Sequence, residues 1–203
     1  MKSLEWNTSA AWFSGLSALL AVSVVWFNWP RMPEDTQARN PVITPMVRGE
    51  EPVLPLPPAP VLPEAKVKLG ERLFFETRLS ADDSQSCATC HDFNRGGADA
   101  QSVSVGVKGA KGSVNAPTVF NVGMNFVQFW DGRAATLEEQ ALGPIENPIE
   151  MGHKLDVMIQ DLSKLDVYNQ RFQAVFGKPV NKDDLAKAIA AFERTILSGN
   201  SPY

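Results

Sequence analysis

Cysteine and histidine are scarce in this sequence. The chain has 203 residues but only two cysteines and two histidines, so a metal site built from sulfur and nitrogen must use very few ligands. Basic runs are also missing, and the net charge is −4. A nucleic-acid-binding protein needs positive side chains that neutralise the phosphates of its partner. This sequence has no such row of side chains, so we expect no nucleic-acid partner.

Charge is absent from one long stretch near the beginning of the chain. Residues 10–30 form a mostly apolar run that is long enough to cross a bilayer as a helix, with tryptophans towards both ends. A cleaved signal peptide is the alternative, but no small-residue cleavage site follows the run. We therefore predict residues 1–30 as a membrane anchor or signal segment.

Proline is concentrated in the next segment. Ten of the 15 prolines fall between Pro30 and Pro63. Proline at this density prevents helix formation and favours extended polyproline geometry. We predict residues 31–63 as a stiff linker that holds the following domain away from the membrane.

The remaining residues, 64–203, have the pattern of one mainly α domain. Residues 92–135 are rich in glycine without a sustained period, which predicts long loops. No convincing strand alternation or internal repeat is present. Apolar periodicity and capping signals predict helices over residues 64–75, 136–142, 154–162, 167–176 and 181–199.

Both cysteines and one histidine lie within five consecutive residues, Cys87-Ala88-Thr89-Cys90-His91. This C-x-x-C-H arrangement is the signature of c-type haem attachment. On one helical turn, two thiols three positions apart can reach the two vinyl groups of haem, while the adjacent imidazole ligates the iron. We predict one covalent haem c bound by Cys87 and Cys90, with His91 as the iron ligand.

Three other interpretations of the two cysteines remain open. A redox-active dithiol would usually lie beside strand–helix–strand patterning, which this sequence does not show. A structural zinc ion needs four cysteine or histidine ligands, and the only histidine after His91 is His153, 62 positions away. A plain disulfide would also suit an exported chain. We assign His153 no role.

Further short motifs surround the C-x-x-C-H sequence. They lie at residues 69–75, 96–97, 115–118, 128–134, 143–145, 147–148 and 150–151. With these motifs, in this order and at this spacing, residues 54–203 resemble the amino-terminal haem domain of the bacterial di-haem cytochrome c peroxidases, the family that includes MauG. The resemblance implies a cytochrome c-like fold and a peroxide-reactive haem. Hydrogen peroxide would be reduced to water there by electrons from a second haem domain.

The same resemblance assigns roles to single residues. Glu150 matches an acid/base carboxylate that moves a proton between the peroxide oxygens, and Gln140 matches an amide that hydrogen-bonds peroxide. Trp130 matches a tryptophan that helps electrons pass between two haems. Asn115 matches one residue of a calcium site, although calcium takes six to eight oxygens. The ordinary alternatives are a solvated carboxylate, a helix-surface glutamine and a core aromatic for the first three.

The sequence departs from the family in two places. Many members have a histidine 16 residues after the iron ligand, where it fills the sixth iron position, and this chain has Val107 there. Valine cannot ligate iron, so we expect an open, five-coordinate iron, with capture by Met124 or Met151 as the alternative. The chain also stops at Tyr203, where the family continues into a second haem domain. We expect a partner to supply that haem and the last helix to expose an apolar surface towards it.

The sequence therefore predicts a peroxidase-type haem protein in the periplasm, anchored to the inner membrane, because haem is attached on the outer side of that membrane in bacteria. Cleavage of the leader would instead leave a soluble periplasmic protein. Two rival functions remain: a single-haem electron carrier with a filled sixth site, and a truncated subunit that is inactive without its missing half.

Overall fold

The computed structural model describes residues 56–199. The predicted membrane segment and most of the proline-rich linker lie outside the described residues. The described part of the linker, residues 56–63, has no regular secondary structure, as its prolines predict. No helix within residues 56–199 is long and apolar enough to cross a membrane.

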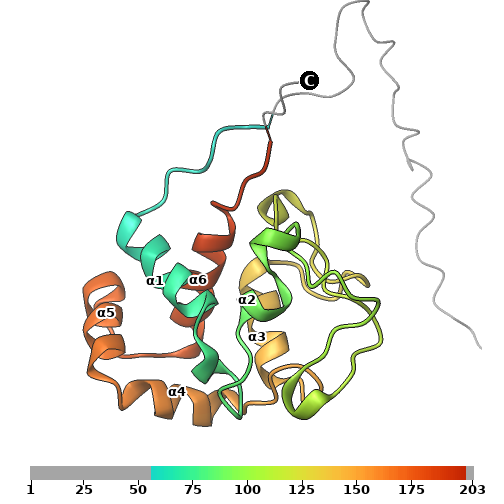
Figure 1. The fold of residues 1–203 in the computed structure, drawn as a ribbon. Helices are drawn as coiled ribbons and strands as arrows, with labels where there is room; N and C mark the ends of the chain where they lie inside the picture. Colours follow the sequence, from blue (N-terminus) through green and yellow to red (C-terminus); the bar gives the residue numbers. More distant parts are fainter. Residues whose placement is uncertain (1–55, 200–203) are drawn as a thin grey trace, which may run out of the picture. The chain divides into compact units, whose positions relative to one another are not determined.

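Helices and loops form the whole of the described fold, and residues 56–199 contain isolated β-bridges but no β-strand. The mainly α prediction is therefore confirmed (Figure 1). Between the second and third helices the chain forms only loops and short 3₁₀ turns, as predicted for the glycine-rich stretch. The helices are α1 (Glu64–Phe74), α2 (Cys87–Cys90), α3 (Leu137–Glu146), α4 (Leu155–Ser163), α5 (Asp166–Phe176) and α6 (Lys182–Glu193).

Helix α6 is the central element of the core. Helices α1 and α3 both pack along it, and α4 and α5 complete one end of the bundle (Figure 1). Leu185 and Ile189 of α6 belong to the same buried cluster as Leu73 and Phe74 of α1. The expectation that the last helix exposes an apolar surface is wrong, because α1 and α3 cover it.

Two helix starts have the caps that the sequence predicts. The Asn181 side chain accepts a hydrogen bond from the Asp184 amide at 2.9 Å, and the Thr136 hydroxyl accepts one from the Glu139 amide at 3.2 Å. Helix α3, however, continues past its predicted end at residue 142. It passes through Pro144 because Ile145, one residue later, is completely buried in the core. Tertiary packing here outweighs the local cost of proline.

Gly70 lies where α1 and α6 approach most closely. A Cβ atom at this position would overlap the carbonyl oxygen of Ala188 and lie 2.9 Å from Phe192 Cβ. We expect Gly70→Ala to lower the free energy of unfolding by about 2 kcal/mol, because overlap with rigid backbone outweighs the better helix propensity of alanine. Chemical denaturation of the purified protein measures this change. Gly112→Ala is the matched control, because the atom nearest to its added Cβ would be 3.4 Å away, so its stability should change little. Equal stability of both variants would contradict the described packing of α1 against α6.

Candidate functional site

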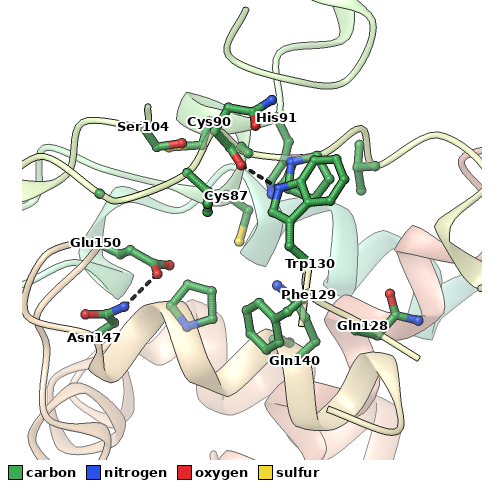
Figure 2. Close-up of a pocket in the computed structure, with 18 of the residues that line it drawn as sticks. Cys87, Cys90, His91, Ser104, Gln128, Phe129, Trp130, Gln140, Asn147 and Glu150 are labelled. Atoms are coloured by element: carbon green, nitrogen blue, oxygen red, sulfur yellow. Dashed lines mark hydrogen bonds between the residues drawn. The ribbon is translucent and has the colours of Figure 1, made fainter. Parts of the chain in front are cut away.

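One cavity of about 470 Å³ lies between α2, α3, α6 and the loops that join α2 to α3. Its volume is within the range of small-molecule and cofactor sites, about 300–1,000 Å³. Figure 2 shows side chains from distant parts of the chain around this space, with Cys87 across it from Gln140. Seven residues to which the sequence assigns a role line the cavity: Cys87, Cys90, His91, Asn115, Trp130, Gln140 and Glu150.

The cysteines lie at the two ends of a single helical turn, α2, as their spacing predicts. The turn is fixed at its start because the Ser86 amide donates a hydrogen bond to Thr89 Oγ1 at 2.9 Å. No disulfide joins Cys87 and Cys90. Burial raises the pKa of the Cys87 thiol to about 12, whereas redox-active thiols have lowered pKa values. The dithiol interpretation is therefore disfavoured.

A hydrogen bond at Nδ1 fixes the orientation of the His91 imidazole and leaves its Nε2 atom without this contact. Its Nδ1 atom donates a hydrogen bond to the backbone oxygen of Gly97 at 3.2 Å. A metal-ligating histidine typically donates one ring N–H to such an acceptor, which leaves the other nitrogen for the metal. Burial lowers the pKa of His91, which favours the neutral imidazole that ligation requires. Gly97 itself has φ +73°, and a Cβ there would lie 2.9 Å from the Phe120 ring.

Glu150 lies in the turn that follows α3. The Asn147 amide donates a hydrogen bond to Glu150 Oε1 at 2.6 Å (Figure 2). The backbone oxygen of Glu150 accepts a hydrogen bond from the Val107 amide at 2.8 Å, and Gly106 leaves no room for a Cβ beside this contact. Both ends of the residue are thus fixed, and its half-buried carboxylate is held at the cavity wall.

The two methionines proposed as a sixth iron ligand differ in their position relative to the cavity. Met151 is buried and lines the cavity. Met124 is 43% exposed and is not part of the cavity wall, so the geometry favours Met151 of the two. Val107 is buried beside Gly152 and does not line the cavity either.

Trp130 lies at the rim of the cavity and is not a core residue, because 64% of its surface is exposed. Its indole N–H donates a hydrogen bond to the backbone oxygen of Asn115 at 3.0 Å, which fixes the ring (Figure 2). The preceding residue, Phe129, has φ +65°, a conformation that costs about 1–3 kcal/mol for such a side chain. The guanidinium of Arg133 lies 3.4 Å from the Phe129 ring centroid and helps to hold it there.

Gln85 and Glu193 are among the polar residues of the cavity wall that sequence reasoning missed. Both carry a buried side-chain oxygen that has no hydrogen-bond partner within residues 56–199, Oε1 of Gln85 and Oε2 of Glu193. Such atoms are rare in folded proteins, and a bound molecule with polar groups would explain them. One signal was available for Glu193: it follows Leu185 and Ile189 at helical spacing, on the face of α6 that is buried.

The donor set and lining of the cavity fit haem c. Two thiols on one turn, a neutral histidine beside them and a mostly apolar wall are what covalent attachment and iron ligation require. Calcium has no comparable support. Among residues 56–199, no group of three or more histidine, cysteine, aspartate or glutamate side chains could hold a metal ion. A calcium ion bound by Asn115 stays a prediction.

Comparison with known proteins finds a matching family model and similar proteins. A family model described as di-haem cytochrome c peroxidase matches residues 64–203. The chain is 47% identical over 154 residues to cytochrome c peroxidase Ccp of Escherichia coli (strain K12), covering 75% of this chain and 33% of that protein. It is 46% identical over 143 residues to cytochrome c551 peroxidase of Pseudomonas aeruginosa, covering 69% and 41%.

A similar fold occurs among solved structures. The crystal structure of a MauG-like protein associated with microbial copper homeostasis matches with a TM-score of 0.65 and 33% sequence identity. The match covers 73% of this chain and 47% of that one. The chain thus spans between a third and a half of the length of these relatives.

Proposed function

Because the chain belongs to the di-haem cytochrome c peroxidase family, we propose that it binds one haem c covalently through Cys87 and Cys90, with His91 ligating the iron, and that it reduces hydrogen peroxide to water. Electrons would come from a partner cytochrome or a second haem domain. One observation supports this most directly: residues as far apart in sequence as Cys87, Gln140 and Glu150 line one cavity of cofactor size.

The bound haem would supply a redox-active iron that passes electrons to peroxide. Glu150 would accept a proton from the peroxide oxygen nearer the iron and return it to the leaving oxygen. Asn147 holds Oε1 of this carboxylate at 2.6 Å, which orients the group and leaves Oε2 for the proton. The Gln140 amide would hydrogen-bond peroxide from α3, while the mostly apolar wall limits access of water.

The exposed loop before α3 supports a protein partner as the electron source. Phe126 is 91% exposed, and Met124 and Trp130 are also exposed. Exposed apolar side chains that lie together in one loop favour a contact surface. Trp130 reaches from this loop to the cavity wall, so it would lie between the haem and the partner.

We also propose a periplasmic location, since haem is attached to C-x-x-C-H motifs on the outer side of the bacterial membrane. Residues 1–30 would anchor the chain or act as its export signal, and residues 31–63 would link this segment to the haem domain, residues 64–203. These assignments depend on the apolar run and the prolines of the sequence.

The absorption spectrum of the purified ferric protein tests this function. We expect a high-spin, five-coordinate iron that changes its spectrum at once on addition of hydrogen peroxide or cyanide, since Val107 cannot ligate iron and does not line the cavity. Peroxide should then be consumed when a reduced cytochrome is supplied. A low-spin spectrum that peroxide leaves unchanged would contradict the proposal.

A second function, single-haem electron transfer, is favoured by one residue. Met151 is buried and lines the cavity, and a methionine sulfur is a common sixth ligand of electron-transfer haems. In that case the ferric protein would be low-spin, and Met151→Leu would convert it to a high-spin form that binds cyanide. Unchanged spectra in the Met151→Leu variant would eliminate this function.

A further inference from the structure

Glu193 is a buried acidic side chain that the proposed peroxide chemistry does not use. It lies at the end of α6, is only 6% exposed and lines the cavity. Its Oε2 atom has no hydrogen-bond partner among the described residues. A carboxylate in such surroundings is costly unless it is neutralised by a cation or by a proton.

Among the described residues, no cation forms an ion pair with Glu193. Arg194, the next residue, is directed towards α3, where it donates two hydrogen bonds to Glu138 at 2.7 and 2.9 Å. Glu138 in turn repels negative charge on Glu193. Burial is the largest cause and raises the pKa of Glu193 to about 8, although the charge of Arg194 acts in the opposite direction. The carboxyl of Glu193 is therefore within reach of protonation near neutral pH.

The other aspartate, glutamate and arginine side chains that line the cavity lie on the loop before α3 and in the turn after it. Asp131 pairs with Arg133 at 2.8 Å, on the loop before α3, and Glu150 is held by Asn147 in the turn after it. On the side of α2, Glu193 acts on Cys87, since it contributes to the raised pKa of that thiol. Glu193 is thus electrostatically close to a cysteine to which the haem would be attached.

We propose that Glu193 is a proton-binding group coupled to the oxidation state of the haem. When a one-electron donor reduces the iron from Fe(III) to Fe(II), the Glu193 carboxylate binds one proton from solvent. When the iron is oxidised again, the carboxyl releases that proton. This inference rests on the proposed haem site but not on peroxide turnover.

The physical reason is the additional positive charge of the ferric iron. Charges that share an apolar cavity interact strongly because the surrounding dielectric constant is low. The ferric state therefore favours the ionised carboxylate, and the ferrous state favours the protonated one. Glu193 would keep the net charge of the cavity nearly constant during electron transfer, which makes reduction easier in the pH range where the group binds its proton.

Spectroelectrochemistry of the whole holoprotein at several pH values tests the proposal. Between the pKa of Glu193 in the ferric protein and its higher pKa in the ferrous protein, the midpoint potential of the wild-type haem should fall as pH rises. The slope should approach about 59 mV per pH unit, the value for a tenfold change in proton activity and one electron. In Glu193→Gln this slope should disappear. The control Glu71→Gln removes an exposed carboxylate of α1 and should keep the slope.

Two results would overturn the inference: a wild-type potential independent of pH in this range, or the same slope in Glu193→Gln, which would assign the proton to another group such as a haem propionate. If that variant does not fold, redox-induced infrared difference spectra of the wild-type protein replace it. Reduction should produce the C=O band of a protonated carboxylic acid, and its absence would also overturn the inference. A purified chain without covalent haem would contradict the proposed function itself.

Discussion

The Glu150→Gln variant is expected to react with hydrogen peroxide about 10²- to 10⁴-fold more slowly than the wild-type ferric protein, the usual contribution of a positioned acid/base group. Glutamine has nearly the same shape, and its carbonyl oxygen can still accept the hydrogen bond that Asn147 donates at 2.6 Å. It cannot accept and return a proton. Stopped-flow absorption of a single turnover measures the effect without any need for an electron donor.

A matched control for this variant is Glu146→Gln, which removes an exposed carboxylate at the end of α3. Its peroxide reaction should remain at the wild-type rate. The absorption spectra of both ferric variants should also match that of the wild type, since neither residue ligates iron. A Glu150→Gln rate within about threefold of wild type would show that this carboxylate is not the proton carrier.

Replacement of both cysteines, Cys87→Ser with Cys90→Ser, is expected to abolish covalent haem attachment completely. A serine hydroxyl does not form the thioether bond that links the protein to the haem vinyl groups. Any haem taken up by the double variant should be extracted into acidified acetone, whereas the wild-type pigment should stay with the denatured protein. Peroxide reactivity of the protein after extraction should be lost with the pigment.

Each single cysteine variant provides a graded control. Cys87→Ser and Cys90→Ser keep one thiol each at opposite ends of α2, so one thioether should still retain the haem after denaturation. One vinyl group would then remain unsaturated, which shifts the absorption spectrum. Pigment that stays bound to the denatured double variant would mean that the haem is attached elsewhere or by another bond.

Much of the fold follows from local sequence signals. The period of apolar residues predicts the bounds of α1, α4 and α5 to within one residue, whereas α6 ends at Glu193, before its predicted end at residue 199. The end of α3 does not follow in the same way. Gly143 and Pro144 oppose helix locally, and only the complete burial of Ile145 in the assembled core explains why the helix continues. The burial of α6 likewise depends on α1 and α3, which pack on it from distant parts of the sequence.

The site was predictable where short motifs carry the chemistry. Spacing alone predicted Cys87, Cys90 and His91, and the family resemblance predicted Glu150, Gln140 and Trp130. All six line the cavity. Glu193 was not found, because a charged residue near a helix end usually lies in solvent. Its burial is a property of the assembled cavity, as is the hydrogen bond between His91 and Gly97, six residues apart in a loop.

The mass of the intact wild-type chain, purified from a bacterium that attaches haem to exported proteins, tests the central claim most directly. We expect the polypeptide mass plus that of a single haem, and we expect the added mass to stay on the proteolytic peptide that contains residues 87–91. A mass equal to that of the polypeptide alone, or haem found on any other peptide, would contradict it.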